Sequence, residues 1–159
     1  MLSIRNIRPD EYPLLNDFLY EAIFIPKGVA APPRSIINDP ALQVYVDRFG
    51  TQPDDRCLVA EADGMVIGAV WTRIMNDYGH LDDQTPSLAI SLYPEYRGKG
   101  IGTILMKKML DLLQKDGYHQ VSLSVQKENA GAIRLYQKTG FETTYVAPDE
   151  YLMVCRLGG

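Results

Sequence analysis

Short segments of alternating apolar and polar residues, or of continuous apolar residues, recur along the chain, and both patterns predict strands. Seven segments have this character: residues 2–8, 56–62, 65–74, 87–93, 119–125, 141–147 and 150–157. Asp63-Gly64, a dipeptide that favours a tight hairpin turn, joins the second segment to the third, and Pro148-Asp149 lies between the last two. The pattern therefore predicts about seven strands.

Apolar residues at helical spacing indicate about four helices between these strands. They are expected over residues 11–25, 40–50, 101–115 and 129–140. Asp10 is the expected N-cap of the first helix, and Pro26 should follow its end. Gly50, Asp116-Gly117 and Gly140 are the expected stops of the other three.

The order of these elements predicts one domain over residues 1–159, an α/β (α+β) fold with a mixed, mostly antiparallel sheet. Only the strand-helix-strand section from Ser87 to Val125 requires a parallel pair. Residues 26–40 contain four prolines and a glycine, which argues against a regular element. This segment is either part of a functional site or a passive surface connection.

Composition and charge exclude several classes of protein. The net charge is −4, which argues against nucleic acid as a partner. No apolar run approaches the ~20 residues that span a membrane, and the first residues lack the pattern of a signal peptide, so a cytoplasmic protein is expected. Cys57 and Cys155 lie in predicted strands and should be reduced core residues, while His80 and His119 are isolated, so no metal site is expected.

The strongest chemical signal is the turn before the third helix. The first N–H groups of a helix have no internal acceptor, and the helix dipole adds positive charge there, so such an end binds anions. Glycines allow the backbone to approach a ligand closely, and two cations and a hydroxyl add to the attraction. The predicted phosphate cradle consists of Arg97, Gly98, Lys99, Gly100, Ile101, Gly102 and Thr103.

This cradle matches neither a P-loop nor a dinucleotide-binding fingerprint, because no lysine-hydroxyl pair follows the last glycine and the glycine spacing differs. It matches Arg/Gln-x-x-Gly-x-Gly/Ala, and the segment "ENAGAIRLYQKTGFE" at 128–142 follows later. With both segments the chain resembles the GNAT superfamily of N-acetyltransferases over nearly its whole length. The resemblance implies acetyl-CoA as donor, with CoA as product, and a primary amine of a small molecule or protein as acceptor.

The resemblance also implies roles for single residues. Asn129 matches a residue that contacts the pantetheine arm, and Tyr136 matches a tyrosine near the cofactor sulfur. Tyr136 would act as general acid, since a tyrosine with its ordinary pKa of about 10 is protonated at neutral pH. In the family the strand at 87–93 splays from its neighbour, so Leu92 N–H is the candidate donor to the acetyl oxygen and the Ile90 backbone would pair with the arm.

The general base and the acceptor are less defined. The base is not identifiable from the sequence; the candidates, each also readable as a solvated surface group, are Glu21, Asp77, His80, Asp82 and Asp83. Tyr20, Glu21 and Phe24 are the residues expected nearest the acceptor. A module that binds acetyl-CoA without turnover, and one that binds ATP, remain alternatives, and the resemblance leaves a homodimer open.

Overall fold

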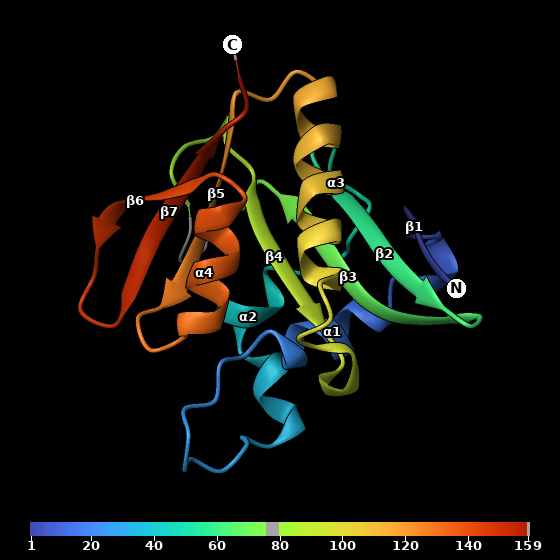
Figure 1. Ribbon diagram of the computed structural model, residues 1–159. Coiled ribbons are helices and arrows are strands. Elements are labelled where there is room, and N and C mark those ends of the chain that lie inside the picture. Colours follow the sequence, from blue (N-terminus) through green and yellow to red (C-terminus); the bar gives the residue numbers. More distant parts are fainter. Residues whose placement is uncertain (76–79, 159) are drawn as a thin grey trace.

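The structure is a computed structural model that describes residues 1–75 and 80–158. Seven strands form one sheet in the order β1-β2-β3-β4-β5-β7-β6 (Figure 1). Their bounds are β1 Leu2–Asn6, β2 Arg56–Ala62, β3 Met65–Arg73, β4 Ser87–Leu92, β5 Gln120–Gln126, β6 Phe141–Val146 and β7 Glu150–Arg156. All neighbours are antiparallel except β4 and β5, so the predicted sheet is confirmed.

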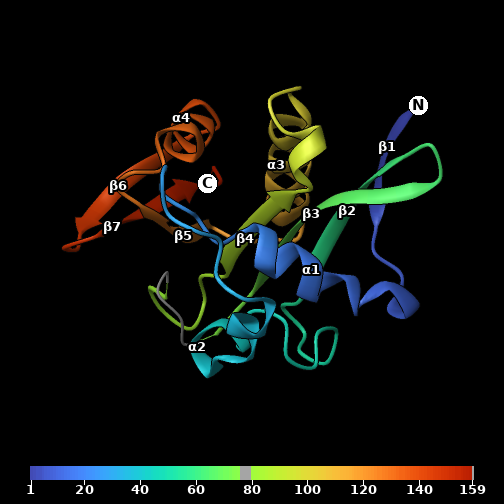
Figure 2. The same cartoon turned by 90° about the horizontal axis from the view of Figure 1, so that it is seen from below.

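The helices cover both faces of the sheet, as the view along its edge shows (Figure 2). One face carries α3 (Ile101–Lys115) and α4 (Ala130–Lys138), and the other carries α1 (Leu14–Glu21) and α2 (Pro40–Gln43). Three 3-10 turns add to these: η1 Pro9–Glu11, η2 Arg34–Asn38 and η3 Pro94–Tyr96. No helix in the described part of the chain is long and apolar enough to cross a membrane.

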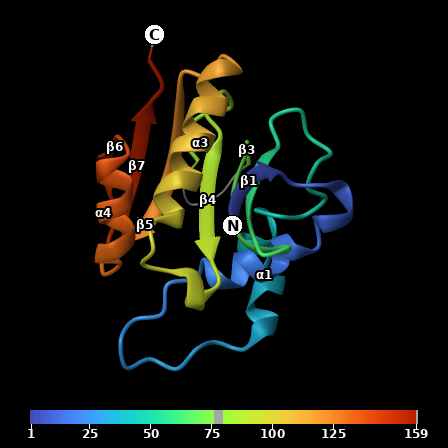
Figure 3. The ribbon, with the colours of Figure 1, turned by 45° about the vertical axis from the view of Figure 1, so that its right-hand side comes forward.

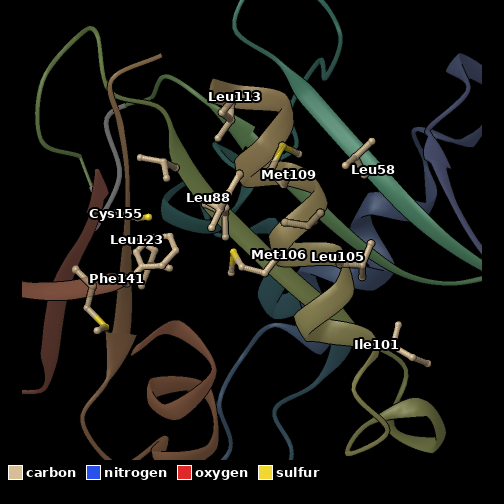
Figure 4. Close-up of a cluster of buried hydrophobic side chains, with 14 of the residues drawn as sticks. Leu58, Leu88, Ile101, Leu105, Met106, Met109, Leu113, Leu123, Phe141 and Cys155 are labelled. Carbon is tan, nitrogen blue, oxygen red and sulfur yellow. The ribbon is translucent and has the colours of Figure 1, made fainter. Parts of the chain in front are cut away.

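Each face has its own hydrophobic core. On the α3 side, Leu105, Met106, Met109 and Leu113 recur at helical spacing and are fully buried against the sheet (Figure 4). On the α1 side, a second cluster forms around Leu15, Phe18 and Trp71, all fully buried. Cys155 lies in the first core and Cys57 in the second, and both thiols are free, so their predicted burial is confirmed.

The predicted turn chemistry holds at several ends. Asp63 and Gly64 both have positive φ, +52° and +82°, as the tight hairpin turn requires. Asp116 is the C-cap of α3 and Gly117 follows with φ +91°. Gly140, with φ +111°, ends the α4 segment in the same way.

The prediction for the first helix is wrong at both ends. Asp10 does not cap it: Pro9–Glu11 form a separate 3-10 turn, and α1 begins only after Pro13. Pro13 has no N–H to continue the helical ladder from that turn, which explains the break. At the other end α1 stops at Glu21, and Arg97 donates a hydrogen bond at 3.1 Å to the Glu21 carbonyl, which has lost its helical donor there.

Two further predictions on the α1 side are corrected. The proline-rich segment 26–40 does contain a regular element, η2, which buries Ile37 in the second core. The helix expected over 40–50 is only α2, and turns follow it. The reason lies in β3: Arg73 donates to the carbonyls of Val44 and Asp47, and Trp71 donates to that of Tyr45. These tertiary donors take the place of a helical ladder.

Candidate active site

Strands β4 and β5 separate soon after they meet, and this split is the centre of the site. They share a single register pair, Ser87↔Ser122, and then diverge toward the lower end of the sheet in Figure 1. Within the described strands, the rest of β4 pairs with β3 alone and the rest of β5 with β7 alone. A parallel pair opened in this way leaves a gap with unpaired backbone groups on both sides.

Alternation along β4 identifies which groups face the gap. The N–H of Tyr93 donates to Ile67 on β3, whereas the carbonyl of Pro86 accepts from Ser122 on β5, at 3.0 Å in each case. Backbone groups of successive residues point to opposite sides of a strand. The N–H groups of Ile90 and Leu92 therefore point toward β5 and into the gap, which is the orientation that their predicted roles require.

The predicted cradle lies directly after β4, at the start of α3. Gly98 and Gly100 have φ of +75° and +84°, a conformation that favours glycine, and a Cβ on either would meet open space. Gly100 is the N-cap of α3, and the first N–H bonded into the helix is that of Ile104. Within residues 1–75 and 80–158, no acceptor is found for the N–H groups of residues 98–103. The cradle thus presents a row of available donors.

The two cations of the cradle are placed differently. Lys99 lies exposed with its ammonium over the Tyr96 ring, 5.6 Å from the centroid. Arg97 is engaged by other groups of the protein: its Nε donates to the Leu92 carbonyl and its Nη2 to the Glu21 carboxylate, each at 3.1 Å. Arg97 therefore ties the end of β4 to the end of α1, and a role in binding phosphate stays a prediction.

Helix α4 brings two predicted residues to the gap. Asn129 is its N-cap, with Oδ1 accepting from Ala132 N–H at 3.2 Å, so its amide NH₂ group remains as a possible donor to a ligand. Tyr136 is half-buried and packs its ring on Phe141, with the centroids 5.8 Å apart. Burial raises the pKa of Tyr136 to about 12, so its hydroxyl is protonated at neutral pH.

A cavity of about 230 Å³ passes through the sheet at the split. Residues 88–90 of β4 and 124–126 of β5 form its sides, and Asn129 and Tyr136 line it from the α4 face. From the α1 face it is lined by Leu19, Ile23, Phe24, Ile36, Leu42 and Tyr45. A ligand group in the gap would therefore be reached from both faces of the sheet.

The predicted acceptor and base residues are scattered. Phe24 lines the cavity, but the Tyr20 hydroxyl donates to the Pro32 carbonyl at 2.6 Å and Glu21 pairs with Arg97. His80 Nδ1 lies 2.7 Å from the Met75 carbonyl, and Asp82 accepts from the N–H of Gln84, neither of them in the cavity lining. Asp83 is exposed beside His80. The structure does not bring these groups together, and Asp77 lies outside the described residues.

The sequence reasoning missed one charged residue of the cavity. Glu150, the first residue of β7, lines it, and its carboxylate accepts from Gln126 Nε2 at 3.1 Å. Its position depends on the register of β7 against β5, in which Gln126 pairs with Glu150. Only the alternation of β7 carries a signal: Glu150 precedes Tyr151, Met153 and Cys155 of the first core, which places it on the opposite face.

Comparisons with known proteins show the family to which the chain belongs. The sequence profile of the Acetyltransferase (GNAT) family matches residues 16–141. An acetyltransferase of Pectobacterium atrosepticum is 30% identical over 67% of this chain and 70% of its own length. A mycothiol acetyltransferase of Paenarthrobacter aurescens is 33% identical over 56% of this chain, but the match spans only 28% of that longer protein.

A solved structure shows the same fold. The PaiA N-acetyltransferase of Thermoplasma acidophilum, determined in complex with coenzyme A, superposes with a TM-score of 0.73 over 98% of this chain and 99% of its own, at 20% identity. The split sheet and the glycine-rich start of α3 therefore belong to a fold that this chain shares with a solved acetyltransferase. The chain belongs to the GNAT family of acetyltransferases.

Proposed function

We propose that this protein is an N-acetyltransferase that moves an acetyl group from acetyl-CoA to a primary amine by direct attack. The observation that carries the proposal is the channel through the sheet at the β4–β5 split, which adjoins Tyr136 on one face and an apolar wall on the other. Membership of the GNAT family and the CoA bound in a protein of the same fold support it.

The described residues fit coenzyme A. The N–H groups at the start of α3, with Gly98 and Gly100 leaving open space above them, suit a pyrophosphate, and Lys99 and Thr103 are near enough in sequence to add to it. Lys107 and Lys108 lie exposed on the same helix and are candidates for the adenosine 3′-phosphate. The pantetheine arm would lie in the gap beside the backbone of Ile90 and next to Asn129.

Two groups of this chain then serve the chemistry. Leu92 N–H, directed into the gap, would donate to the acetyl oxygen as negative charge develops on it. Tyr136, whose raised pKa keeps it protonated, would give its proton to the leaving thiolate. The thioester supplies the acetyl group and a sulfur leaving group, and the chain supplies the positions of donor and acid.

The remaining expectations stay part of the proposal. The two buried free cysteines suit a reducing compartment, in line with a cytoplasmic location. The small cavity favours a small molecule over a protein as acceptor. A homodimer stays a prediction. A sensor that binds acetyl-CoA without turnover is less well supported, because a sensor would not need the wall on the α1 face.

The test is thiol release from acetyl-CoA over a panel of amines, with CoA binding measured by calorimetry. Tyr136→Phe should lower kcat by about 10²–10⁴-fold and leave CoA affinity nearly unchanged. Tyr145→Phe, on the exposed surface of β6, is the matched control and should behave as the unaltered protein. CoA binding without thiol release for every amine would instead establish the sensor.

A further inference from the structure

The part of the cavity on the α1 face has an apolar roof. Seven residues from α1, the turn after it, η2 and the α2 segment form this roof: Leu19, Ala22, Ile23, Phe24, Ile36, Leu42 and Tyr45. None of these residues is Asp, Glu, Lys, Arg or His. The chain between α1 and η2 extends beyond the same end of the sheet at which the turn before α3 lies (Figure 3). The roof therefore covers the gap from the face opposite to Tyr136.

The floor beneath this roof is polar. Val125 of β5 and Tyr151 of β7 belong to the core on the α3 face, so their neighbours along the strands point to the α1 face. Those neighbours are Ser124, Gln126 and Glu150, and all three line the cavity. Among the described residues of the lining, Glu150 is the one with a carboxyl side chain, and none is Lys, Arg or His.

Glu150 is held in a defined position. It lies directly opposite Gln126 in the β5–β7 ladder, and the Gln126 amide donates to its Oε1 at 3.1 Å. Glu150 is half-buried, and a carboxylate partly shielded from water attracts a cation more strongly than one in bulk water, because the local dielectric is lower. The ordered amide fixes where that cation would be placed.

We propose that the acceptor is a small monoamine with an apolar body, bound with its ammonium group at Glu150 and its body under the α1 and α2 roof. This inference rests on the proposed function and specifies its substrate class. Glu150 is also the proton acceptor that the sequence did not reveal. It lies on one face of the split and Tyr136 on the other, so the base and the acid are on opposite sides of the thioester.

The proton transfers balance. The ammonium loses one proton to the Glu150 carboxylate, which passes it to water, and the neutral amine nitrogen attacks the acetyl carbon. The N–C bond forms and the C–S bond breaks. The thiolate takes the Tyr136 hydroxyl proton, and the tyrosinate recovers a proton from the new amide nitrogen. The products are the N-acetyl amine, CoA thiol and one proton in water.

The length of the alkyl chain of the amine tests whether the acceptor's apolar body binds under the roof. Propylamine, butylamine and pentylamine should show kcat/KM rising about fourfold per methylene, which corresponds to about 0.8 kcal/mol per buried CH₂. Pentane-1,5-diamine is the matched probe of charge and should react at least about 100-fold less well than pentylamine, because its second ammonium would enter the apolar roof. Equal rates along the series, or a preference for the diamine, would overturn the proposal.

Two matched variants test the carboxylate. Glu150→Gln should lower kcat/KM for pentylamine by about 10²–10⁴-fold, the range for loss of a general base that also binds the ammonium. Glu142→Gln, on exposed β6, should change it by less than about twofold. Phe24→Asp adds a carboxylate to the half-buried edge of the roof and should raise the ratio of diamine to monoamine turnover.

The outcomes separate this inference from the proposed function. CoA affinity, measured by calorimetry, should be the same in Glu150→Gln and in the unaltered protein, because the carboxylate lies on the face away from α3 and α4. Thiol release that occurs with amines but is insensitive to Glu150→Gln would refute the acceptor assignment alone. Absence of thiol release with every amine would refute the proposed function instead.

Discussion

The turns after α2 depend on one buried ion pair, and its removal gives a sharp test of how the roof is held. Arg73 and Asp55 are 2% and 1% exposed, and they are joined by two contacts of 3.0 Å. Asp55 Oδ2 also accepts from the N–H groups of Gly50 and Gln52. Both carboxylate oxygens therefore face only donors, so Asp55→Asn must direct its NH₂ group at another donor, whichever way the amide turns.

The expected cost of Asp55→Asn is about 3–5 kcal/mol, the usual range when one partner of a buried pair is removed and the other charge stays buried. For a chain of 159 residues this lowers Tm by roughly 6–20 °C. The assay is thermal and urea unfolding followed by circular dichroism.

The control is Asp116→Asn, which breaks the partly exposed Arg56–Asp116 pair and should cost no more than about 1 kcal/mol. If the two variants differed by less than about 1 kcal/mol, the argument that burial makes the first pair costly would be refuted.

Three further predictions concern backbone strain and pH. Gly100→Ala places a Cβ at φ +84°, so it should lower the free energy of unfolding by about 1–2 kcal/mol and weaken CoA binding. Gly131→Ala, inside α4, should instead raise the free energy of unfolding by roughly 1 kcal/mol. Urea unfolding measures the stabilities and calorimetry measures CoA binding. The hydrogen bond from Arg5 lowers the pKa of Glu11 from 4.5 to about 2, so ionised Glu11 should stabilise the fold above pH 4.5 and lose this effect as pH falls from 4.5 to 2. In Glu11→Gln the free energy of unfolding should therefore change less with pH over this range. Because the pKa of Tyr136 is about 12, its ionisation should not lower kcat between pH 7 and 10. The pH profiles of kcat for the unaltered protein and for Tyr136→Phe should therefore have the same shape in this range.

The sequence predicted best those features that depend on local geometry. The Asp63-Gly64 hairpin and the α3 end at Gly117 each require positive φ, and residue type alone indicates where this is cheap. The strands and α3 were found because one buried face imposes a period on the sequence. The available N–H groups at the start of α3 were predictable for the same reason, since an N–H group without a helical acceptor is a property of the helix start itself.

The sequence could not predict those helix ends at which side chains from distant strands donate to backbone carbonyls. Residues 40–50 have apolar residues at spacings that suit a helix, yet the carbonyls after α2 accept from Arg73 and Trp71 on β3, about thirty positions later in the chain. The Glu21 carbonyl at the end of α1 likewise accepts from a distant donor, Arg97. A pattern of residues does not show which distant donor will compete with a helix's own ladder.

Glu150, the carboxylate to which we assign the base, could not be predicted from the sequence for a related reason. Its position follows from the β4–β5 split. A group can take part in a reaction in the gap only if it lies where β4 and β5 have diverged. That region begins after the single β4–β5 pair, Ser87↔Ser122. Glu150 reaches them because β7 begins opposite the last residue of β5, Gln126, just where β5 has lost β4 as a neighbour. Moving β7 by one residue would turn the carboxylate to the Tyr136 face and bring Tyr151 under the roof. The proposed site therefore depends on the register of β7 against β5, which the local sequence pattern does not reveal.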